Sequence, residues 1–504
     1  MEQAVSVLKF GGTSVGSGER ICQVADIVTN MLRDPEASFP VVVVSAMSGI
    51  TDQLLRIARQ TCLGQYEESA REFALLRQKH LDAAAIIADT PETLTSLRSD
   101  LEEGLSELSS DIAQLREAAE QGREIMLPTA AVASWGERLS IRLVSAAIRA
   151  CGVEAEAVRR EIIVTTHPQA DSSLPFGIVV GADPIVEQTR ANAHALIEPL
   201  VKQHIVPVAA GFIGRTITGY VTTLGRNGSD YSATVIGAAL DCVEVSIYTD
   251  VDGVLTADPR LVANARLLSH LSYAEAARLS WFGAKVLHPR TLIPVAARNI
   301  PVRVRNTFRP HNRGTVVGPV GRQQSGATAI TIRRNLALIT VESTDLFGAP
   351  ENAGQVFELA ARAGAAPVAI CSSSGHHLSF VVEEQSAQSV VELLQHDLHG
   401  DAFGGAWQVK SRTGLAACAC IGSGFTSDPM SPARSVAALA REHIPIITQG
   451  ASELGIVLIV EDHNSQRALR CLHRDLIAPV IPLVRHAATQ EKRREASKTI
   501  STRG

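Results

Sequence analysis

The stretch Val7–Val15, which reads Val-Leu-Lys-Phe-Gly-Gly-Thr-Ser-Val, decides the fold of this chain. An apolar run from Val5 to Phe10 is broken by two adjacent glycines, and apolar residues then recur at helical spacing from Ile21 to Leu32. This pattern predicts a buried strand, a tight turn and an amphipathic helix.

The same stretch is typical of an anion-binding turn. Paired glycines let backbone N–H groups approach a ligand, the following helix presents its positive end, and Lys9 adds a full charge. A Walker A loop is excluded because the lysine precedes the glycines and no Gly-Lys-Ser/Thr follows, and a dinucleotide fingerprint is excluded because its Gly-x-Gly-x-x-Gly spacing is absent. Two interpretations fit: a phosphate-binding turn, or a plain strand-to-helix turn that uses Gly11 and Gly12 for positive φ.

The composition is that of an ordinary globular protein. Its 504 residues suggest two to four domains, and a net charge of −5 without a polybasic region predicts no nucleic-acid partner. No segment approaches the roughly 18 apolar residues of a membrane span, and no signal-peptide pattern precedes the first strand, so we expect a cytoplasmic protein. The eight cysteines form no Cys-x-x-Cys pair, so neither a zinc site nor a disulfide framework is predicted, and we expect Cys418 and Cys420, in an apolar run, to be small buried side chains.

Strand and helix signals alternate over roughly the first three hundred residues. Val41–Val44 and Ile205–Ala210 are continuous apolar runs, typical of strands covered on both faces. Ile162–Val164 and Ile300–Val304 give shorter strand signals, and residues 66–124 predict two or three long helices. This alternation predicts βαβ units and a largely parallel sheet.

Polar residues follow these predicted strands. Ser45 and Thr51 come after Val41–Val44, where ligands bind in open α/β sheets, but a turn former and a helix N-cap fit them equally. Glu137 lies in an otherwise apolar helix, where a charge is more often on a solvated face.

A second cluster, Leu224–Tyr231, reads Leu-Gly-Arg-Asn-Gly-Ser-Asp-Tyr. It places the guanidinium of Arg226 on a flexible loop before a predicted helix, which suits a carboxylate or a phosphate. Asp230 is either part of such a site or a helix cap.

A third cluster, Tyr248–Arg260, contains Thr-Asp-Val-Asp-Gly-Val. It is not an EF-hand, which needs a glycine at position six and a glutamate at position twelve. Asp250 either holds Mg²⁺ bound to nucleotide phosphates or begins an Asp-Gly turn. Lys285, in the helical-looking segment Trp281–Pro289, is either a second cation for phosphate or a surface lysine.

Together the three clusters, with Asp-Pro-Arg at 258–260 and Phe-Gly-Ala-Lys-Val-Leu-His-Pro at 282–289, closely resemble the aspartate kinases of the amino acid kinase family. The resemblance implies an α/β fold, with a three-layer αβα catalytic domain and a mostly parallel sheet over residues 1–310. It also implies phosphorylation of the side-chain carboxylate of L-aspartate by ATP and Mg²⁺. The product, 4-phospho-L-aspartate, begins the pathway to lysine, threonine and methionine.

The same resemblance assigns roles to single residues. Lys9, with the backbone of Gly11 and Gly12, would hold the transferring phosphoryl group. Five residues would line the aspartate pocket, with Glu137 at the α-ammonium and Arg226 at a carboxylate. They are Ser45, Thr51, Glu137, Arg226 and Ser229.

The nucleotide side is assigned in the same way. It would carry Thr249, Asp250, Arg260 and Lys285, with Asp250 next to a magnesium ion bound through the ATP phosphates. Leu255 stands where many relatives carry an aromatic residue, so the packing of adenine would differ here.

The chemistry limits these roles. The nucleophile is a carboxylate with a reference pKa of about 3.9, so no general base is required. Catalysis then rests on positioning and on cations that offset charge in the transition state. We therefore expect Lys9, Arg226 and Asp230 to be catalytic, with Asp230 orienting Lys9 or a metal ion.

An internal repeat begins near Leu336. Segments 78 residues apart match without gaps, as Val382 and Val460 show. This predicts two βαββαβ units, which in aspartate kinases are ACT domains that bind amino-acid effectors and pair subunits. We expect them at 330–400 and 410–485, in sequential or interleaved order, followed by a flexible tail over 487–504 and a homodimer or higher homo-oligomer.

Four residues are carried over as candidate effector contacts, namely Ser374, Gln449, Ser452 and Glu453. The first repeat has Ser-Ser-Ser-Gly-His-His at 372–377, where relatives show a different polar pair, so lysine or threonine feedback stays open. No Gly-x-Gly-x-x-Gly unit follows the repeats, and we expect no fused homoserine dehydrogenase.

Two other functions remain open. Another amino acid kinase, acting on glutamate, acetylglutamate or UMP, is disfavoured by the Phe-Gly-Gly-Thr-Ser motif together with the repeats. An amino-acid sensor with a lapsed kinase domain would lack one of the charged residues assigned above, and all of them are present.

Overall fold

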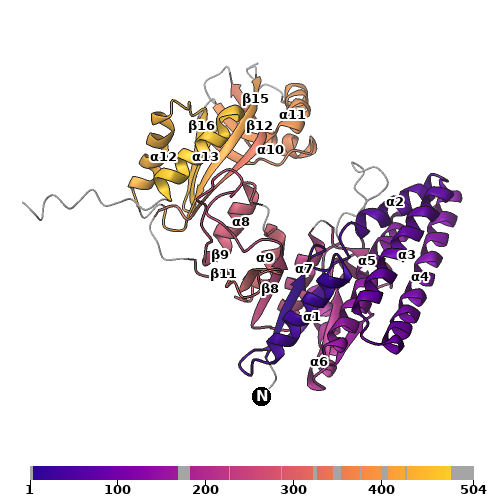
Figure 1. The fold of residues 1–504 in the computed structure, drawn as a ribbon. Coiled ribbons are helices and arrows are strands. Elements are labelled where there is room, and N and C mark those ends of the chain that lie inside the picture. Colours follow the sequence, from indigo (N-terminus) through magenta and orange to yellow (C-terminus); the bar gives the residue numbers. More distant parts are fainter. Residues whose placement is uncertain are drawn as a thin grey trace, which may run out of the picture. The chain divides into compact units, whose positions relative to one another are not determined.

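The computed structural model describes residues 4–168, 182–225, 227–284, 287–321, 326–343, 353–374, 377–398, 407–425 and 428–477 (Figure 1). The chain divides into two compact units. Unit 1 comprises Met1–Val254, Leu267–Trp281 and Lys285–Arg322, and unit 2 comprises Leu255–Arg266, Phe282–Ala284 and Gln323–Gly504. The predicted tail over 487–504 lies outside the described residues.

Unit 1 is built on an eight-stranded sheet with the order β3-β5-β2-β1-β8-β10-β11-β9. Apart from the antiparallel pair of β10 and β11, neighbouring strands in this sheet are parallel, which confirms the prediction. The strands are β1 (Val5–Phe10), β2 (Phe39–Val44), β3 (Ala155–Val158), β5 (Val206–Ala210), β8 (Glu244–Thr249), β9 (His270–Ser272), β10 (Val302–Asn306) and β11 (Thr315–Gly318).

The centre of this sheet is apolar on both faces. Val41–Val44 in β2 are fully buried, as are Val7 and Phe10 in β1. Such two-sided burial is what central parallel strands require. β1 lies between β2 and β8, where the strand order reverses, and the carboxyl ends of strands at such a point are where open α/β sheets bind ligands.

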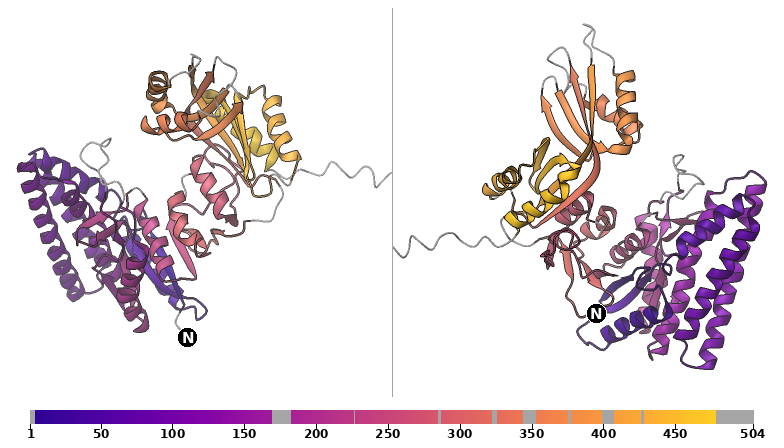
Figure 2. Two further views of the ribbon diagram at one scale, coloured as in Figure 1. Left: turned by 180° about the vertical axis from the view of Figure 1, so that it is seen from behind. Right: turned by 45° about the horizontal axis from the view of Figure 1, so that its top comes forward.

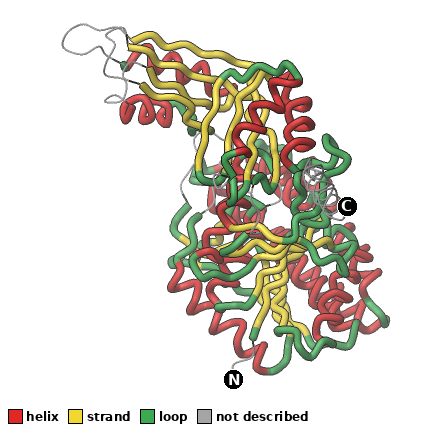
Figure 3. Tube along the Cα trace, turned by 90° about the vertical axis from the view of Figure 1, so that its left-hand side faces the viewer, coloured by secondary structure: helices red, strands yellow, loops and turns green. Residues whose placement is uncertain are grey.

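Helices cover both faces of the sheet, which confirms the predicted three-layer αβα arrangement (Figure 3). On one face α1 (Gly18–Leu32) packs against α5 (Met126–Ala150), and α2 (Ile50–Cys62), α3 (Tyr66–Ile87) and α4 (Pro91–Glu120) pack around them. The other face carries α6 (Val186–Lys202), α7 (Gly228–Ala239) and α9 (Pro289–Ala296). No helix in the described ranges combines the length and the hydropathy needed to cross a bilayer.

Two local predictions in this part of the sequence were wrong. Ile162–Val164 forms almost no strand: only β4 (Val164–Thr165) pairs, in a small sheet with β6 (Ile213–Thr216) and β7 (Val221–Thr223). The helical reading of Trp281–Pro289 fails because α8 (Tyr273–Trp281) ends there. Gly283 has a φ of 110°, and a Cβ on it would lie 2.6 Å from the carbonyl oxygen of Ile332.

Unit 2 is built on a six-stranded antiparallel sheet with the order β13-β14-β12-β15-β17-β16. Its strands are β12 (Ala329–Ser343), β13 (Ala369–Ser374), β14 (His377–Glu383), β15 (Trp407–Ile421), β16 (Thr448–Ser452) and β17 (Gly455–Glu461). Its helices are α10 (Ala353–Arg362), α11 (Glu384–Asp397), α12 (Met430–Arg441) and α13 (Ser465–Leu476).

The two long strands β12 and β15 run through both halves of this sheet (Figure 2). Their register shifts between Arg333 and Leu338, and on either side of the shift the sheet carries a separate apolar core. β14 in the first half and β17 in the second lie 78 residues apart, as the repeat predicts. The two ACT-like halves therefore share their long strands.

A segment from the middle of the chain belongs to unit 2. Ala257 and Val262 lie in the second apolar core, and the Thr256 hydroxyl lies 2.9 Å from Nε2 of His473 on α13. The Ile330 N–H donates to the Thr256 carbonyl at 2.9 Å. The residues that directly follow Val254 thus pack against the sheet of unit 2 rather than that of unit 1.

Candidate active site

The Gly-Gly turn, defined here as Gly11–Ser14, follows β1 at the carboxyl edge of the sheet. The N–H of Ser14 donates to the Gly11 carbonyl at 2.8 Å, and the N–H of Gly11 donates to the Tyr248 carbonyl at 3.3 Å. A Cβ on Gly12 would lie 3.0 Å from the Ala46 carbonyl oxygen, and one on Gly11 would lie 3.3 Å from Nζ of Lys9.

Glycine is therefore favoured at both positions because neighbouring atoms lie too close for a side chain. Neither Gly11 nor Gly12 has a positive φ, so the interpretation that they merely supply a left-handed turn is wrong. α1 begins only at Gly18, with Ser17 as its N-cap, so several residues separate the turn from the helix N-terminus.

Lys9 ends in an ion pair with Asp230, which joins β1 to the first turn of α7. Lys9 is 7% exposed. A buried ammonium is costly without a counter-ion, and the carboxylate of Asp230 supplies one. The pair has the geometry that the proposed orienting role of Asp230 requires, and the catalytic role itself stays a prediction.

Glu137 enters the same edge from α5. It is 2% exposed, so its interpretation as part of a solvated face is wrong. Its Oε1 accepts a hydrogen bond from the Ala46 N–H at 3.0 Å, whereas Oε2 has no hydrogen-bond partner within the described residues. Burial raises the pKa of Glu137 to about 8, against the smaller opposing effects of the Ala46 hydrogen bond and the Lys9 charge.

α5 can approach this closely because of a neighbouring glycine. A Cβ on Gly136 would lie 2.5 Å from the Cβ of Ala46, at the end of β2. The glycine before Glu137 thus brings the carboxyl group to the strand end.

The remaining predicted aspartate contacts lie on nearby turns. Ser45 follows β2, where its N–H donates to the Phe10 carbonyl at 3.1 Å. Thr51 lies in the first turn of α2, whose N-cap is Gly49, so Thr51 is not the helix cap. Ser229 is buried in the first turn of α7, beside Gly211.

The predicted nucleotide residues lie in different parts of the chain. Thr249 ends β8, and its hydroxyl donates to the exposed carboxylate of Asp250 at 3.1 Å. Arg260 belongs to unit 2, where its guanidinium pairs with Asp258 at 2.8 Å and its side chain is 85% exposed. Arg226 and Lys285 lie outside the described residues.

The candidate effector residues lie at edge strands of unit 2. Gln449 and Ser452 are exposed on β16, and Glu453 is exposed in the turn that follows. Ser374 ends β13, and its side chain lies outside the described part of the structure.

One connection was not predicted from the sequence. The hydroxyls of Ser14 and Thr307, both buried, lie 2.6 Å apart, and the Thr307 N–H donates to the Thr249 carbonyl at 2.9 Å. Asn306 donates to Asp252 at 2.7 Å. The end of β10 therefore holds the Gly-Gly turn and the loop after β8 together.

The arrangement places the ammonium of Lys9 next to the Gly-Gly turn. It also provides the carboxyl group of Glu137, whose Oε2 accepts no hydrogen bond within the described residues. Within the described ranges no cluster of three or more His, Cys, Asp or Glu side chains could hold a metal ion. A single exposed carboxylate such as Asp250 fits a magnesium ion that is held mainly by phosphate oxygens. These groups suit positioning and charge stabilisation rather than proton abstraction.

Comparisons with known proteins agree with this geometry. Residues 4–306 match the amino acid kinase family, and residues 419–476 match an ACT domain. The chain is 34% identical to the bifunctional aspartokinase/homoserine dehydrogenase 2 of Zea mays, over 93% of this chain and 50% of that protein. It is 31% identical to aspartokinase 3 of Arabidopsis thaliana, over 93% of this chain and 80% of that protein.

A solved structure shows the same likeness over most of the chain. Aspartokinase III of E. coli, in complex with aspartate and ADP, has a TM-score of 0.73 at 27% identity, with 94% of this chain and 99% of that one covered. The same enzyme has also been solved with lysine and aspartate. The chain spans about half the length of the bifunctional plant relatives that it matches.

Proposed function

We propose, since the chain belongs to the amino acid kinase family and resembles its aspartokinases along its length, that it phosphorylates the side-chain carboxylate of L-aspartate with ATP. The product is 4-phospho-L-aspartate. This reaction is the first step toward lysine, threonine and methionine, and we place it in the cytoplasm.

The observation that carries this proposal is the carboxyl group of Glu137. Its buried Oε2 has no protein partner in the described structure, and Lys9 is near enough to influence its pKa. The α-ammonium of an amino acid supplies the missing hydrogen-bond donor. N-acetylglutamate and UMP carry no ammonium group, so this site favours a free amino acid over both.

We assign the following roles to the residues of the site. Lys9 offsets negative charge on the phosphoryl group over the Gly-Gly turn, and Asp230 holds the ammonium of Lys9 in place. Glu137 fixes the amino end of aspartate, and Ser45, Thr51 and Ser229 line the pocket. Arg226, carried over from the sequence motif, binds a carboxylate.

ATP and magnesium complete the site. Asp250 would hold the ion, with Thr249 and Lys285 on the nucleotide side. A magnesium ion supplies charge neutralisation between the phosphates. The aspartate carboxylate is already ionised at neutral pH, so none of these residues needs to act as a base.

Unit 2 provides the regulation in this proposal. Its ACT-like halves bind lysine or threonine at Ser374, Gln449, Ser452 and Glu453 and pair two chains into a homodimer. Activity measured across lysine and threonine concentrations tests this, and an unchanged rate with both amino acids would contradict it. Feedback requires the effector to bind two states of the protein unequally.

Trapping with hydroxylamine tests the catalytic proposal. The chain is incubated with Mg-ATP, hydroxylamine and one acceptor at a time: L-aspartate, L-glutamate, N-acetylglutamate or UMP. We expect the hydroxamate of aspartate in large excess over the glutamate product, and no acceptor-dependent ADP release with the last two. ADP release with another acceptor identifies a different amino acid kinase, and none with any acceptor identifies a sensor.

A further inference from the structure

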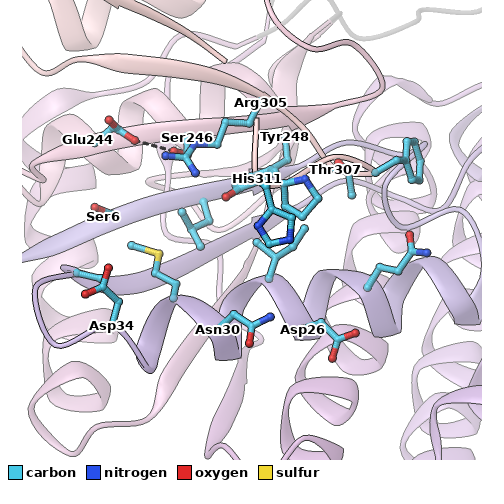
Figure 4. A pocket seen from close by; sticks show the side chains of 17 residues that line it. Ser6, Asp26, Asn30, Asp34, Glu244, Ser246, Tyr248, Arg305, Thr307 and His311 are labelled. Carbon is cyan, nitrogen blue, oxygen red and sulfur yellow. Dashed lines mark hydrogen bonds between the residues drawn. The ribbon is translucent and has the colours of Figure 1, made fainter. Parts of the chain in front are cut away.

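Unit 1 contains a cavity on one face of its sheet. It has a volume of about 630 Å³ and lies between α1 and the face of the sheet formed by β1, β8 and β10 (Figure 4). This volume is in the range of small-molecule sites in proteins. None of the residues assigned above to aspartate, nucleotide or effector binding lines it.

Arg305, on β10, provides a positive charge in this cavity. Its Nε is buried and has no hydrogen-bond partner among the described residues. The neighbouring Arg303 differs, because it forms a bidentate ion pair with Glu244, with Nε to carboxylate distances of 3.0 and 2.9 Å. Glu244 is thus already paired and does not serve Arg305. The Nε–H of Arg305 therefore has no acceptor in the described structure, and an anion from outside the chain would supply one.

Tyr248 stands beside Arg305 in the cavity (Figure 4). Burial raises the pKa of its phenol, and the charge and hydrogen bonding of Arg305 oppose that shift. The two side chains therefore lie near enough to bind one carboxylate together.

The opposite wall is acidic. α1 presents Asp26 and Asn30, and Asp34 follows the end of the helix (Figure 4). A phosphate ester would place two negative charges opposite these carboxylates, which is unfavourable. A ligand with one carboxylate and one ammonium group matches both walls.

The floor between the walls is apolar. It is formed by Leu8 and Ile27, which are buried in the sheet and helix layers, together with Met31. An aliphatic side chain would contact these three residues.

We propose that this cavity binds a free amino acid. Its carboxylate lies on Arg305 and Tyr248, its ammonium faces Asp26, and its side chain rests on Leu8, Ile27 and Met31. The site is separate from the ACT-like halves, and the proposal does not depend on the substrate of the kinase.

The cavity also touches the supports of the Gly-Gly turn. Tyr248 accepts the Gly11 N–H through its carbonyl, and its ring stacks on Phe10 with a centroid distance of 4.7 Å. Thr307 lines the cavity and binds the hydroxyl of Ser14. An amino acid in the cavity therefore contacts two of the residues that hold this turn.

Calorimetric titration of the full chain with L-leucine tests the proposal. We expect saturable binding, and binding weaker by about tenfold or more for leucinamide and for 4-methylpentanoate, because each lacks one of the two charges. Absence of saturable L-leucine binding would overturn the proposal.

Variants locate the binding. Arg305→Leu should abolish it and Arg305→Lys should restore part of it, while Arg71→Leu, at an exposed arginine of α3, should leave it unchanged. If Arg305→Leu does not fold, Asp26→Asn, at an exposed position, should weaken binding of L-leucine but not of 4-methylpentanoate. Equal leucine affinity in wild type, Arg305→Leu and Asp26→Asn would place the amino acid elsewhere and contradict the proposal.

Discussion

The two units differ in what they bury. Among the described residues, all the buried lysine, arginine and glutamate side chains lie in unit 1, and two of them, Lys9 and Glu137, lie at the carboxyl edge of its sheet. Both cores of unit 2 are apolar, and the described candidate effector side chains lie exposed at an edge strand. Because burial of charge is unfavourable, its concentration in unit 1 indicates chemistry there, whereas unit 2 is stabilised by packing.

Asp230→Ala tests the charged side of this comparison and should lower both stability and rate. It leaves the buried ammonium of Lys9 without its carboxylate, so we expect the free energy of unfolding to fall by about 3–5 kcal/mol. We also expect kcat to fall by about 10²–10³-fold. Urea unfolding and the hydroxamate assay measure the two effects.

The control is Asp258→Ala, which breaks the exposed pair with Arg260 in unit 2. We expect the free energy of unfolding to fall by only about 0–1 kcal/mol in this variant. Equal changes in the two variants would show that burial of the Lys9 pair has no special energetic weight.

The features of the two units that could be predicted from the sequence depend on residues close together in the chain. Gly11, Gly12 and Lys9 are adjacent in the chain, and Ser45 and Thr249 follow apolar runs, so their places at strand ends could be inferred. The repeat of unit 2 was visible because both copies keep their strand pattern.

The part that was missed depends on contacts between distant residues. Ser14 and Thr307 lie 293 positions apart, and the approach of Gly136 to Ala46 depends on how α5 packs on the sheet. The assignment of Leu255–Arg266 to unit 2 depends on apolar contacts of Ala257 and Val262 that no local pattern reveals. Helical spacing at Phe282–Ala284 likewise could not show the close backbone approach at Gly283.

Phe380→Ala tests the apolar side of the comparison. Phe380 is fully buried in the first core of unit 2, and removal of such a side chain costs about 3–5 kcal/mol. Thermal unfolding should show an early transition for unit 2, while aspartate phosphorylation without effector persists below that temperature. Simultaneous loss of activity and of all structure would show that the two units do not unfold separately.

Glu137→Gln tests the open acceptor in unit 1. The pKa of Glu137 is raised to about 8, so the carboxyl is mostly protonated at pH 6.5 and ionised above pH 8. In the proposed role the ionised form binds the α-ammonium of aspartate, so the KM for aspartate should fall as pH rises from 6.5 to 8.5. In the Gln variant KM should be about 10-fold to 100-fold higher and nearly independent of pH, beyond titration of the substrate itself.

A pH profile of KM that is the same in both proteins would show that Glu137 does not meet the substrate ammonium. Circular dichroism of the Gln variant serves as the check on folding.

Thr307→Val should have the smallest effect. It removes one buried hydrogen bond and leaves the Ser14 hydroxyl unpaired, which costs about 1–3 kcal/mol. We expect kcat to fall several-fold with little change in the KM for aspartate, and Thr307→Ser to restore it. Failure of serine to restore kcat would mean that the methyl group, not the hydroxyl, supports the Gly-Gly turn.

The most direct test of the account is the phosphoryl-transfer step in Lys9→Ala. Aspartate and ATP binding are measured by equilibrium dialysis, and transfer is measured by rapid quench with saturating substrates, with Lys202→Ala at an exposed position of α6 as the control. We predict a transfer rate lower by about 10³-fold or more, with both substrates still bound. Transfer at the wild-type rate would contradict the role of Lys9 and of the Gly-Gly turn as the place where the phosphoryl group is held.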